Sequence, residues 1–178
     1  MAIAFLGFGS NMGDRLQNFK KAQEILESFE VRFLEWAPIY ETEPVAPLPE
    51  DAEQAWYLNS VAKVEIDHSA WSLFLLGKEV EANMGRSKTT FEEEGVLRYF
   101  PRIIDVDLLM YDNDQIEMER LQVPHPRFHL RKYDLTPFAD LAPTLIHPVF
   151  NKTIQELLLA CADSATVRVY SSSLSAIS

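Results

Sequence analysis

The chain has 178 residues, 47% of them hydrophobic and 24% charged, which is enough for one domain with a sizeable core. Its formal net charge of −11 argues against general binding to nucleic acid or anionic membranes, because both need clustered Lys and Arg. The single cysteine, Cys161, excludes an internal disulfide, and no apolar run is long enough to span a bilayer. We expect a cytoplasmic monomer with no nucleic-acid or membrane partner, in which Cys161 is a small buried hydrophobe.

The chain opens with a pattern of strand, helix and strand. Residues 2–9, "AIAFLGFG", form a continuous apolar run, which is typical of a strand buried on both faces. A helix is expected over about 14–29, with Asn11 or Asp14 as its cap and apolar residues at helical spacing. A second extended run, "VRFLEWAPIYETE", leads into "PVAPLPED", whose three prolines predict a loop.

The rest of the chain continues with both kinds of element. The segment "YLNSVAKVEID" alternates between apolar and polar residues, which predicts a half-buried strand. Residues 69–84 predict a helix capped by Ser69, and "GRSKTTFEEEGVL" predicts a polar loop. The strand "RIIDVDLLMYD" follows, and then a second loop, "VPHPRFHLRKYD". Helices are expected near 135–141 and over 152–162, and a frayed tail over 171–178.

This order of elements predicts the fold class. The order β-α-β-β-α-β, followed by a helical extension, indicates an α/β (α+β) protein with a ferredoxin-like sandwich. Its antiparallel sheet would carry helices packed on it, and residues 1–170 would form a single domain. The fold serves many functions, so the function has to be inferred from the site.

Two carboxylates, Asp105 and Asp107, interrupt a strand that is otherwise apolar. Residues two apart in a strand share a face and lie roughly 6.6–7 Å apart along the chain. The aspartate face must be open, since two unpaired carboxylates are costly to bury. The residues expected on the opposite face, toward the core, are Ile104, Val106, Leu108 and Met110.

Three explanations of these aspartates are open on the residues alone. They could be solvated on an exposed sheet face, pair with Arg98 and Arg102, or bind hard divalent cations. Two acids on one strand face can bridge a pair of Mg²⁺ ions that in turn hold a polyphosphate. The nearby arginines favour that reading, because guanidinium groups match phosphate oxygens.

Six segments, taken in chain order, resemble the 6-hydroxymethyl-7,8-dihydropterin pyrophosphokinase family. They are "GSNMGD", "YETEPV", "YLN", "EANMGR", "RYFPRIIDVDLLMYD" and "LQVPHPRFHLRKYDLTPFADLAP". Each segment alone is a weak signal, whereas "PRIIDVDLL" followed by "VPHPR" is close to diagnostic. The resemblance implies transfer of the terminal pyrophosphate of ATP to the hydroxymethyl group of the pterin, with release of AMP, in folate biosynthesis.

The resemblance also implies roles for residues on the nucleotide side. Asp105 and Asp107 match the ligands of two Mg²⁺ ions, one bridging the α- and β-phosphates and one the β- and γ-phosphates. Arg86 and Arg102 match the arginines that act on the phosphates during transfer, where they would stabilise the migrating charge. The residues that match the nucleotide contacts are Lys88, Arg98, His125 and Arg131.

On the substrate side, the resemblance implies a pocket for the pterin ring. A flat heteroaromatic ring needs aromatic faces and polar groups at its edge, which Tyr57, Tyr133 and Asn59 would supply. Glu81 and Asn11 also align with family positions. The residues that match the pterin pocket are Thr42, Pro44, Val45, Tyr57, Asn59 and Tyr133.

The segment after residue 85 departs from the family pattern, because it inserts the acidic "TTFEEEGVL". We expect Glu92, Glu93 and Glu94 to point away from ATP. Loops that close over ATP are the expected moving parts, so residues 85–98 are predicted to be mobile without ligand. The competing class is a binding module that keeps ATP affinity without transfer; it would most economically lose a metal carboxylate or a transfer arginine. An RNA-binding ferredoxin-like domain needs an exposed aromatic pair amid basic residues on its central strands. This class is rejected, because "AIAFLGFG" is too apolar and the chain is too acidic.

Overall fold

The apolar run at the start of the chain forms β1 (Ala2–Ser10), the strand on which the central sheet is built. The structure is a computed structural model that describes residues 1–44, 55–85, 90–93, 96–99 and 101–171, without the side chains of 90–93 and 96–99. Antiparallel pairing places β1 between β4 (Tyr57–Ile66) and β7 (Asp105–Tyr111).

The central sheet has six strands and the path order β12-β3-β4-β1-β7, with β2 also paired to β4. All of these pairings are antiparallel, as expected from the sequence. The three other strands of the sheet are β2 (Arg32–Trp36), β3 (Ile39–Thr42) and β12 (Val167–Ser171).

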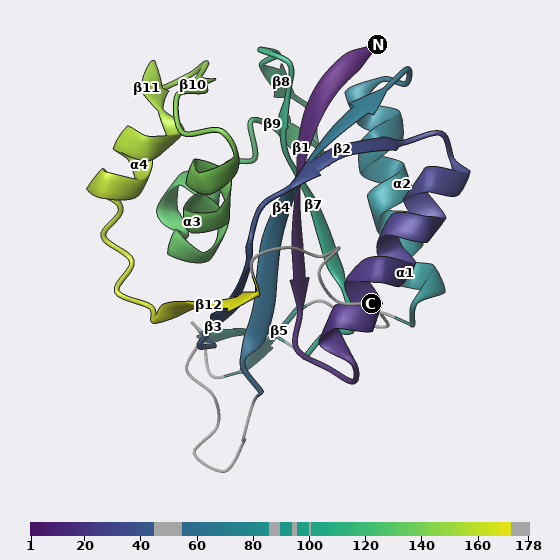
Figure 1. Cartoon of the computed structure of the whole chain (residues 1–178), viewed down its shortest axis with the longest axis vertical. Coiled ribbons are helices and arrows are strands. Elements are labelled where there is room, and N and C mark those ends of the chain that lie inside the picture. The colour runs from purple at the N-terminus through teal and green to yellow at the C-terminus, as the bar shows by residue number, and fades with distance from the viewer. Residues whose placement is uncertain (45–54, 86–89, 94–95, 100, 172–178) are drawn as a thin grey trace.

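Helices cover both faces of this sheet (Figure 1). On one face lie α1 (Arg15–Ser28) and α2 (Ala70–Asn83), which begin after the N-caps Asp14 and Ser69. On the other face lie α3 (Lys132–Leu141) and α4 (Ile154–Ala160), which correspond to the expected helical extension. Each of these helices was predicted, and the main difference is that α3 begins about one turn earlier than its expected start.

Short elements occupy segments that the sequence did not identify as strands. The expected polar loop contains β5 and the start of β6, which pair as a hairpin. Strand β12 was missed, although Val167 and Val169 alternate as in a strand, and its side chains are mostly exposed. The bounds of the short elements are Thr90–Glu93 (β5), Val96–Tyr99 (β6), Ile116–Glu117 (β8), Gln122–Val123 (β9), Phe128–Leu130 (the 3-10 helix η1), Ile146–His147 (β10) and Lys152–Thr153 (β11).

The sheet separates two hydrophobic clusters, because successive side chains of a strand point to opposite faces. Leu6 and Phe8 of β1 belong to the cluster under α1 and α2, whereas Phe5 packs on Phe138 of α3. Cys161 is half-buried against this second cluster. Gly7 and Gly9 fall on the α3 side of the sheet, where a Cβ would lie 3.3 Å from Leu109 Cδ1 and 3.0 Å from Asn59 Oδ1, respectively.

Strand β7 alternates in the same way, but only over its first half. Val106 and Leu108 enter the α1–α2 cluster, while Asp105 and Asp107 point to the other side. The pairing with β1 then shifts register between Phe5 and Leu6. This bulge sends Met110 into the α3–α4 cluster, so its expected place beside Val106 was wrong.

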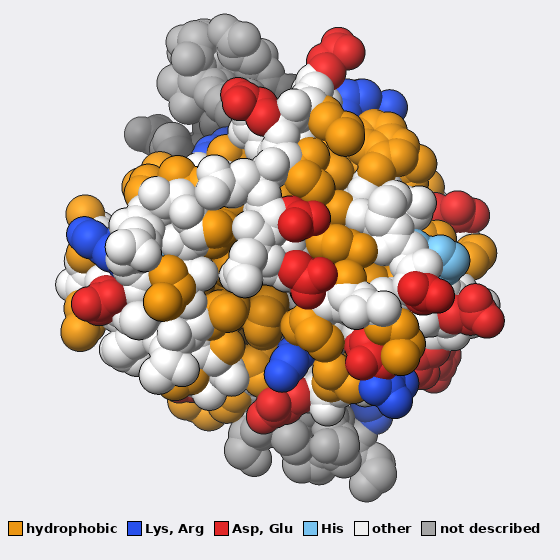
Figure 2. All heavy atoms as spheres, turned by 90° about the horizontal axis from the view of Figure 1, so that it is seen from above, with side chains coloured by type: hydrophobic (Ala, Val, Ile, Leu, Met, Phe, Trp, Pro, Cys, Tyr) orange, Lys and Arg blue, Asp and Glu red, His pale blue; other side chains and the backbone are white. Residues whose placement is uncertain are grey.

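The outer surface agrees with the acidic composition. On the face seen in Figure 2, acidic and apolar side chains are interspersed, and the described Lys and Arg side chains are few and scattered. The described side chains of this face therefore form no basic patch of the kind that binds a phosphate backbone. Among the described helices, none has the length and apolar character needed to cross a membrane.

Helix α2 lies close to β7 because it carries a glycine at the contact. A Cβ on Gly77 would lie 3.3 Å from both Cγ1 and the carbonyl oxygen of Val106. The small residue therefore sets the distance between α2 and the strand that carries the two aspartates.

We predict that Gly77→Leu lowers the free energy of unfolding by about 2 kcal/mol, because the larger side chain overpacks this contact. Urea denaturation would measure the change. Ala82→Leu, which adds the same side chain at an exposed position of α2, serves as the control and should change the free energy little. Equal stability of the two variants would contradict the close packing inferred at Gly77.

Candidate active site

A cavity of about 270 Å³ lies on the side of the sheet where the two aspartates and the two glycines of β1 point. Gly9 is part of its floor, and a Cβ there would come within 3.0 Å of Asn59 Oδ1. Besides Gly7, Phe8 and Gly9, the cavity is lined by Thr42, Glu43, Pro44, Tyr57, Asn59, Arg102, Asp105, Asp107, Arg127, Leu130, Arg131, Tyr133, Asp134 and Asp163.

Three carboxylates meet beside this cavity. Asp105 and Asp107 come from β7, and Glu81 comes from the last turn of α2. One oxygen from each lies within 4.8 Å of the others. A cluster of carboxylate oxygens on rigid elements has the donor set that Mg²⁺ prefers.

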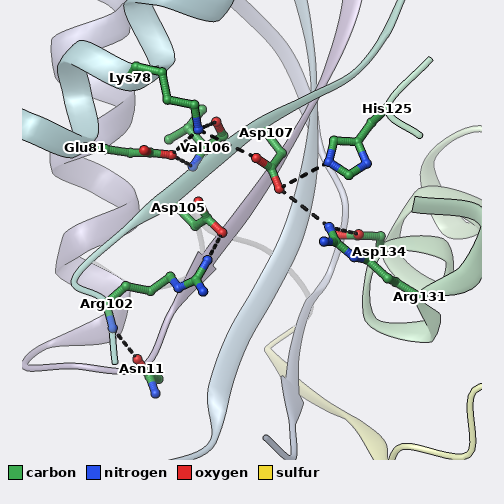
Figure 3. A network of polar contacts seen from close by, with 10 residues as sticks. All are labelled: Asn11, Lys78, Glu81, Arg102, Asp105, Val106, Asp107, His125, Arg131 and Asp134. Carbon is green, nitrogen blue, oxygen red and sulfur yellow. Dashed lines mark hydrogen bonds and ion pairs between the residues drawn. The ribbon is translucent and has the colours of Figure 1, made fainter. Parts of the chain in front are cut away.

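Hydrogen bonds from α2 and from β7 hold Glu81 in place. Its Oε1 accepts from the backbone N–H of Val106 at 2.9 Å and from Lys78 Nζ at 2.8 Å. The side chain is 5% exposed, so these partners are what make its burial tolerable. Glu81 thus links α2 to Val106, the residue of β7 between the two aspartates (Figure 3).

Arg102 forms an ion pair with Asp105, as one of the sequence-based explanations proposed. Its backbone is fixed by Asn11, whose Oδ1 accepts from the N–H of Arg102 at 2.7 Å and whose own N–H donates to the Arg102 carbonyl at 3.1 Å. Burial alone would lower the pKa of Arg102, but Asp105 raises it, so the guanidinium stays charged. The turn after β1 therefore positions the Arg102 guanidinium beside Asp105, a candidate metal ligand.

Asp107 faces several nitrogen-bearing side chains (Figure 3). Lys78 Nζ lies 3.8 Å from its Oδ1, and His125 Nε2 and Arg131 Nη1 lie 3.9 Å and 3.7 Å from its Oδ2. Burial and the neighbouring Asp105 raise the pKa of Asp107, while the cations oppose that shift. The negative charge of Asp107 is thus balanced from both sides of the strand.

His125 is a neutral imidazole at this site. Burial, followed by Arg131 and Arg127, lowers its pKa to about 3. Its Nδ1 accepts a hydrogen bond from the N–H of Arg127 at 3.2 Å, which leaves Nε2 directed at Asp107. The ring therefore offers a neutral donor to the carboxylate.

The far side of the cavity has an aromatic and amide character. Asn59 Nδ2 donates to Thr42 Oγ1 at 2.6 Å, which fixes the amide on the neighbouring strands β4 and β3. Tyr57 and Tyr133 both line the cavity. Burial raises the pKa of Tyr133, so its hydroxyl is protonated at neutral pH. Two rings and a fixed amide suit a flat heteroaromatic ligand.

Comparison with known proteins agrees with this geometry. The family described as 7,8-dihydro-6-hydroxymethylpterin-pyrophosphokinase (HPPK) matches residues 5–143. The chain belongs to the HPPK family. Its resemblance to that family and its expected enzyme class are therefore confirmed: it is a pyrophosphokinase of folate biosynthesis, with ATP as co-substrate and 6-hydroxymethyl-7,8-dihydropterin as acceptor.

The chain is similar in sequence both to relatives of about its own length and to much longer proteins. The chain is 33% identical over 156 residues to the 2-amino-4-hydroxy-6-hydroxymethyldihydropteridine pyrophosphokinase of Aquifex aeolicus, covering 88% of the chain and 90% of the relative. It is 36% identical over 171 residues to the folic acid synthesis protein fol1 of Schizosaccharomyces pombe, covering 96% of the chain but 22% of that protein. The chain thus spans about a fifth of the fission yeast relative.

Solved structures share the fold of this HPPK chain. One described as HPPK-DHPS in complex with substrates has a TM-score of 0.68 at 13% identity, covering 89% of this chain and 43% of the other. Plasmodium falciparum HPPK-DHPS has a TM-score of 0.66 at 16% identity, covering 89% of this chain and 41% of the other. The expected mixed architecture of antiparallel sheet and helices is confirmed.

The structure brings most of the sequence-predicted residues of this HPPK chain to one place. Arg102, Asp105, Asp107 and Arg131 line the cavity together, and His125 contacts Asp107. Outside the described part of the chain lie the predicted residues Val45, Arg86 and Lys88 and the side chains of Arg98 and Glu92–Glu94. The expected mobility of residues 85–98 stays a prediction, because only part of that segment is described. The cavity residues Thr42, Pro44, Tyr57, Asn59 and Tyr133 complete the described set.

Several contributors to the site were not predicted from the sequence, among them Lys78, Asp134 and Gly7. Lys78 looked like an ordinary helix residue, Asp134 stood at the end of the expected loop "VPHPRFHLRKYD", and Gly7 looked like part of a buried strand. Lys78 precedes Glu81 by three residues, and this helical spacing was the available signal for their pairing. Nothing in the local sequence indicated that Asp134 would point into the cavity.

We predict that the free energy of unfolding falls as the pH drops from about 6.5 toward 3, and that His125→Gln reduces this dependence. The unfolded chain binds a proton near the ordinary His pKa, whereas folded His125 does not until pH about 3. The stability contributed by neutral His125 is thus present above the unfolded pKa and lost below it. Urea denaturation at several pH values measures the slope, with His68→Gln as an exposed control. An unchanged slope in His125→Gln would overturn the assignment.

Proposed function

We propose that this cavity carries the pyrophosphate transfer, with Asp105 and Asp107 holding two Mg²⁺ ions at the phosphates of ATP. The observation that supports the proposal is the meeting of three carboxylates within 4.8 Å beside the cavity, with Arg102 and Arg131 next to them. The ligand oxygens are of the type that Mg²⁺ requires, and the bound ions would neutralise phosphate charge. Strand β7 supplies both aspartates from a rigid element.

The basic residues would act on the phosphates. Arg102 and Arg86 would stabilise the charge that moves with the pyrophosphoryl group, as electrostatic catalysis requires. Lys88, Arg98, His125 and Arg131 would contact the nucleotide. The described members of this set, Arg102, His125 and Arg131, support the proposal because each contacts an aspartate assigned to the metal ions.

The aromatic side of the cavity would bind the pterin. Tyr57 and Tyr133 would lie against the ring faces, and the Asn59 amide would hydrogen-bond its edge. Thr42 fixes that amide through the 2.6 Å hydrogen bond, and Pro44 lines the same wall; Val45 completes the proposed set. This arrangement would hold the hydroxymethyl group toward the phosphates, so that orientation contributes to the rate.

Three broader features are also proposed. The order of β3, β4, β1 and β7, with α1 and α2 on one face, supports a ferredoxin-like core within a single domain of residues 1–170. A lone half-buried cysteine, Cys161, fits a reducing cytoplasm. We propose that the protein acts there as a monomer.

We predict that AMP forms only when Mg²⁺, ATP and the reduced pterin are all present, and that Asp107→Ala lowers its rate by more than about 100-fold. The loss follows because one carboxylate of the proposed ion-binding pair is removed. Chromatography of the nucleotide products measures the reaction, and Asp114→Ala, at an exposed turn, is the control. ADP as the product would contradict pyrophosphate transfer. Full activity of Asp107→Ala would contradict the proposed site, and magnesium-dependent ATP binding without turnover would indicate a binding module.

We predict that Asn59→Leu raises the Kd for the pterin by about 100-fold, because a site built to hydrogen-bond a ligand loses that partner. Binding of ATP should stay within about twofold, since Asn59 lies on the aromatic side of the cavity. Isothermal titration with each ligand separates the two effects. Asn83→Leu, exposed at the end of α2, is the matched control. Parallel losses for both ligands would instead indicate general damage to the fold.

A further inference from the structure

Asp134 is a buried carboxylate that the roles proposed above do not use. It lies in the first turn of α3, is 9% exposed, and lines the cavity. Its helix neighbours Leu135 and Phe138 are fully buried apolar residues of the second cluster. A carboxylate at such a position is costly unless a partner balances its charge, so its partner indicates what it does.

That partner is Arg131, the residue directly before α3. Arg131 Nη1 lies 3.5 Å from Asp134 Oδ2, and the same nitrogen lies 3.7 Å from Asp107 Oδ2 (Figure 3). One guanidinium nitrogen is thus shared almost equally between a carboxylate on β7 and a carboxylate on α3. At such similar distances the two attractions are comparable, so neither carboxylate alone fixes the guanidinium.

Binding of a divalent cation at Asp107 would change the partners of the shared Arg131 guanidinium. A cation held by Asp107 would repel Arg131 and would compete with it for the Asp107 carboxylate. The Arg131 side chain is only 17% exposed, so leaving its guanidinium without a counter-charge would be costly. Asp134 supplies that counter-charge on the side away from β7.

We propose that Asp134 is a positioning residue: its carboxylate keeps the Arg131 guanidinium in an ion pair when Asp107 binds a divalent cation instead. The inference rests on the proposed metal site at Asp105 and Asp107. Asp134 thereby lowers the competition between Arg131 and the cation for Asp107. It also draws Arg131 back from a phosphate that arrives without its metal ion, so the site favours the metal–nucleotide complex over free nucleotide.

Because this role depends on the charge of Asp134, removing the charge should change the affinity for divalent cations and the affinity for metal-free ATP in opposite directions. Removing the charge leaves Arg131 to pair with Asp107 alone, which weakens divalent cation binding. The same change frees one side of Arg131 and removes a negative charge from the cavity, which strengthens binding of metal-free ATP. A side chain that merely supported the fold would weaken both, because it would loosen the whole cavity.

The test compares Asp134→Asn with wild type at pH 8, above the pKa of about 7 to which burial raises Asp134. Mn²⁺ binding is followed by electron paramagnetic resonance, and ATP binding in EDTA by isothermal titration. We expect Asp134→Asn to weaken Mn²⁺ binding roughly fivefold and to strengthen metal-free ATP binding by roughly the same factor. Asp134→Glu, which keeps the charge, should restore both values in part.

Two controls separate this role from others. Asp140→Asn removes a charge from the same helix but at a residue that bonds to Tyr40 outside the cavity lining, and should leave both affinities unchanged. In an Arg131→Met background, Asp134→Asn should no longer strengthen ATP binding, because the shared guanidinium is gone. This double-mutant comparison measures the coupling directly, provided that each variant keeps a cooperative unfolding transition.

The outcomes test the proposed metal site and the proposed role of Asp134 separately. If Asp107→Ala binds Mn²⁺ as wild type does, the metal site itself is wrong, and the role of Asp134 falls with it. If Asp107→Ala loses Mn²⁺ but Asp134→Asn changes neither affinity, or lowers both, only the role of Asp134 is overturned. Opposite changes in the two affinities, abolished in the Arg131→Met background, support it.

Discussion

The structure depends on how two negative charges are kept next to each other at the edge of a hydrophobic core. Asp105 and Asp107 share one face of β7, and burial together with Asp105 raises the pKa of Asp107. Such a pair persists only when cations compensate it. Arg102 pairs with Asp105, while Lys78 and Arg131 flank Asp107 (Figure 3).

These compensating groups come from separate parts of the chain, which explains why so much of the fold converges here. Lys78 belongs to α2, Arg102 precedes β7, and Arg131 precedes α3. The two helical layers of Figure 1 thus contribute to a single charge network across the sheet. An overall acidic chain can therefore present locally balanced charge to a polyphosphate, because the distribution of charge matters more than the sum.

Space for ligands comes from residues that are small or fixed. Gly7 and Gly9 leave the floor of the cavity without side chains, and Asn59 is held by Thr42. Glu81 connects α2 to the backbone of β7 at Val106, so the position of the helix and that of the aspartates are linked. A pyrophosphokinase needs this rigidity, since transfer between two bound substrates depends on their relative orientation.

The sequence by itself determined most of the sheet, the helices, the caps of α1 and α2, the family and the two aspartates. These features follow from local sequence periodicity. Strand alternation predicted that Asp105 and Val106 lie on opposite faces of β7, and helical spacing placed Ser69 at the start of α2. Tertiary structure decided what local periods cannot express. The bulge that moved Met110 to the other cluster depends on pairing with β1, and β12 forms because β3 offers an edge. The position of Asp134 beside Arg131 and Asp107 depends on α3 docking against the sheet, because distant segments meet only when the chain has folded.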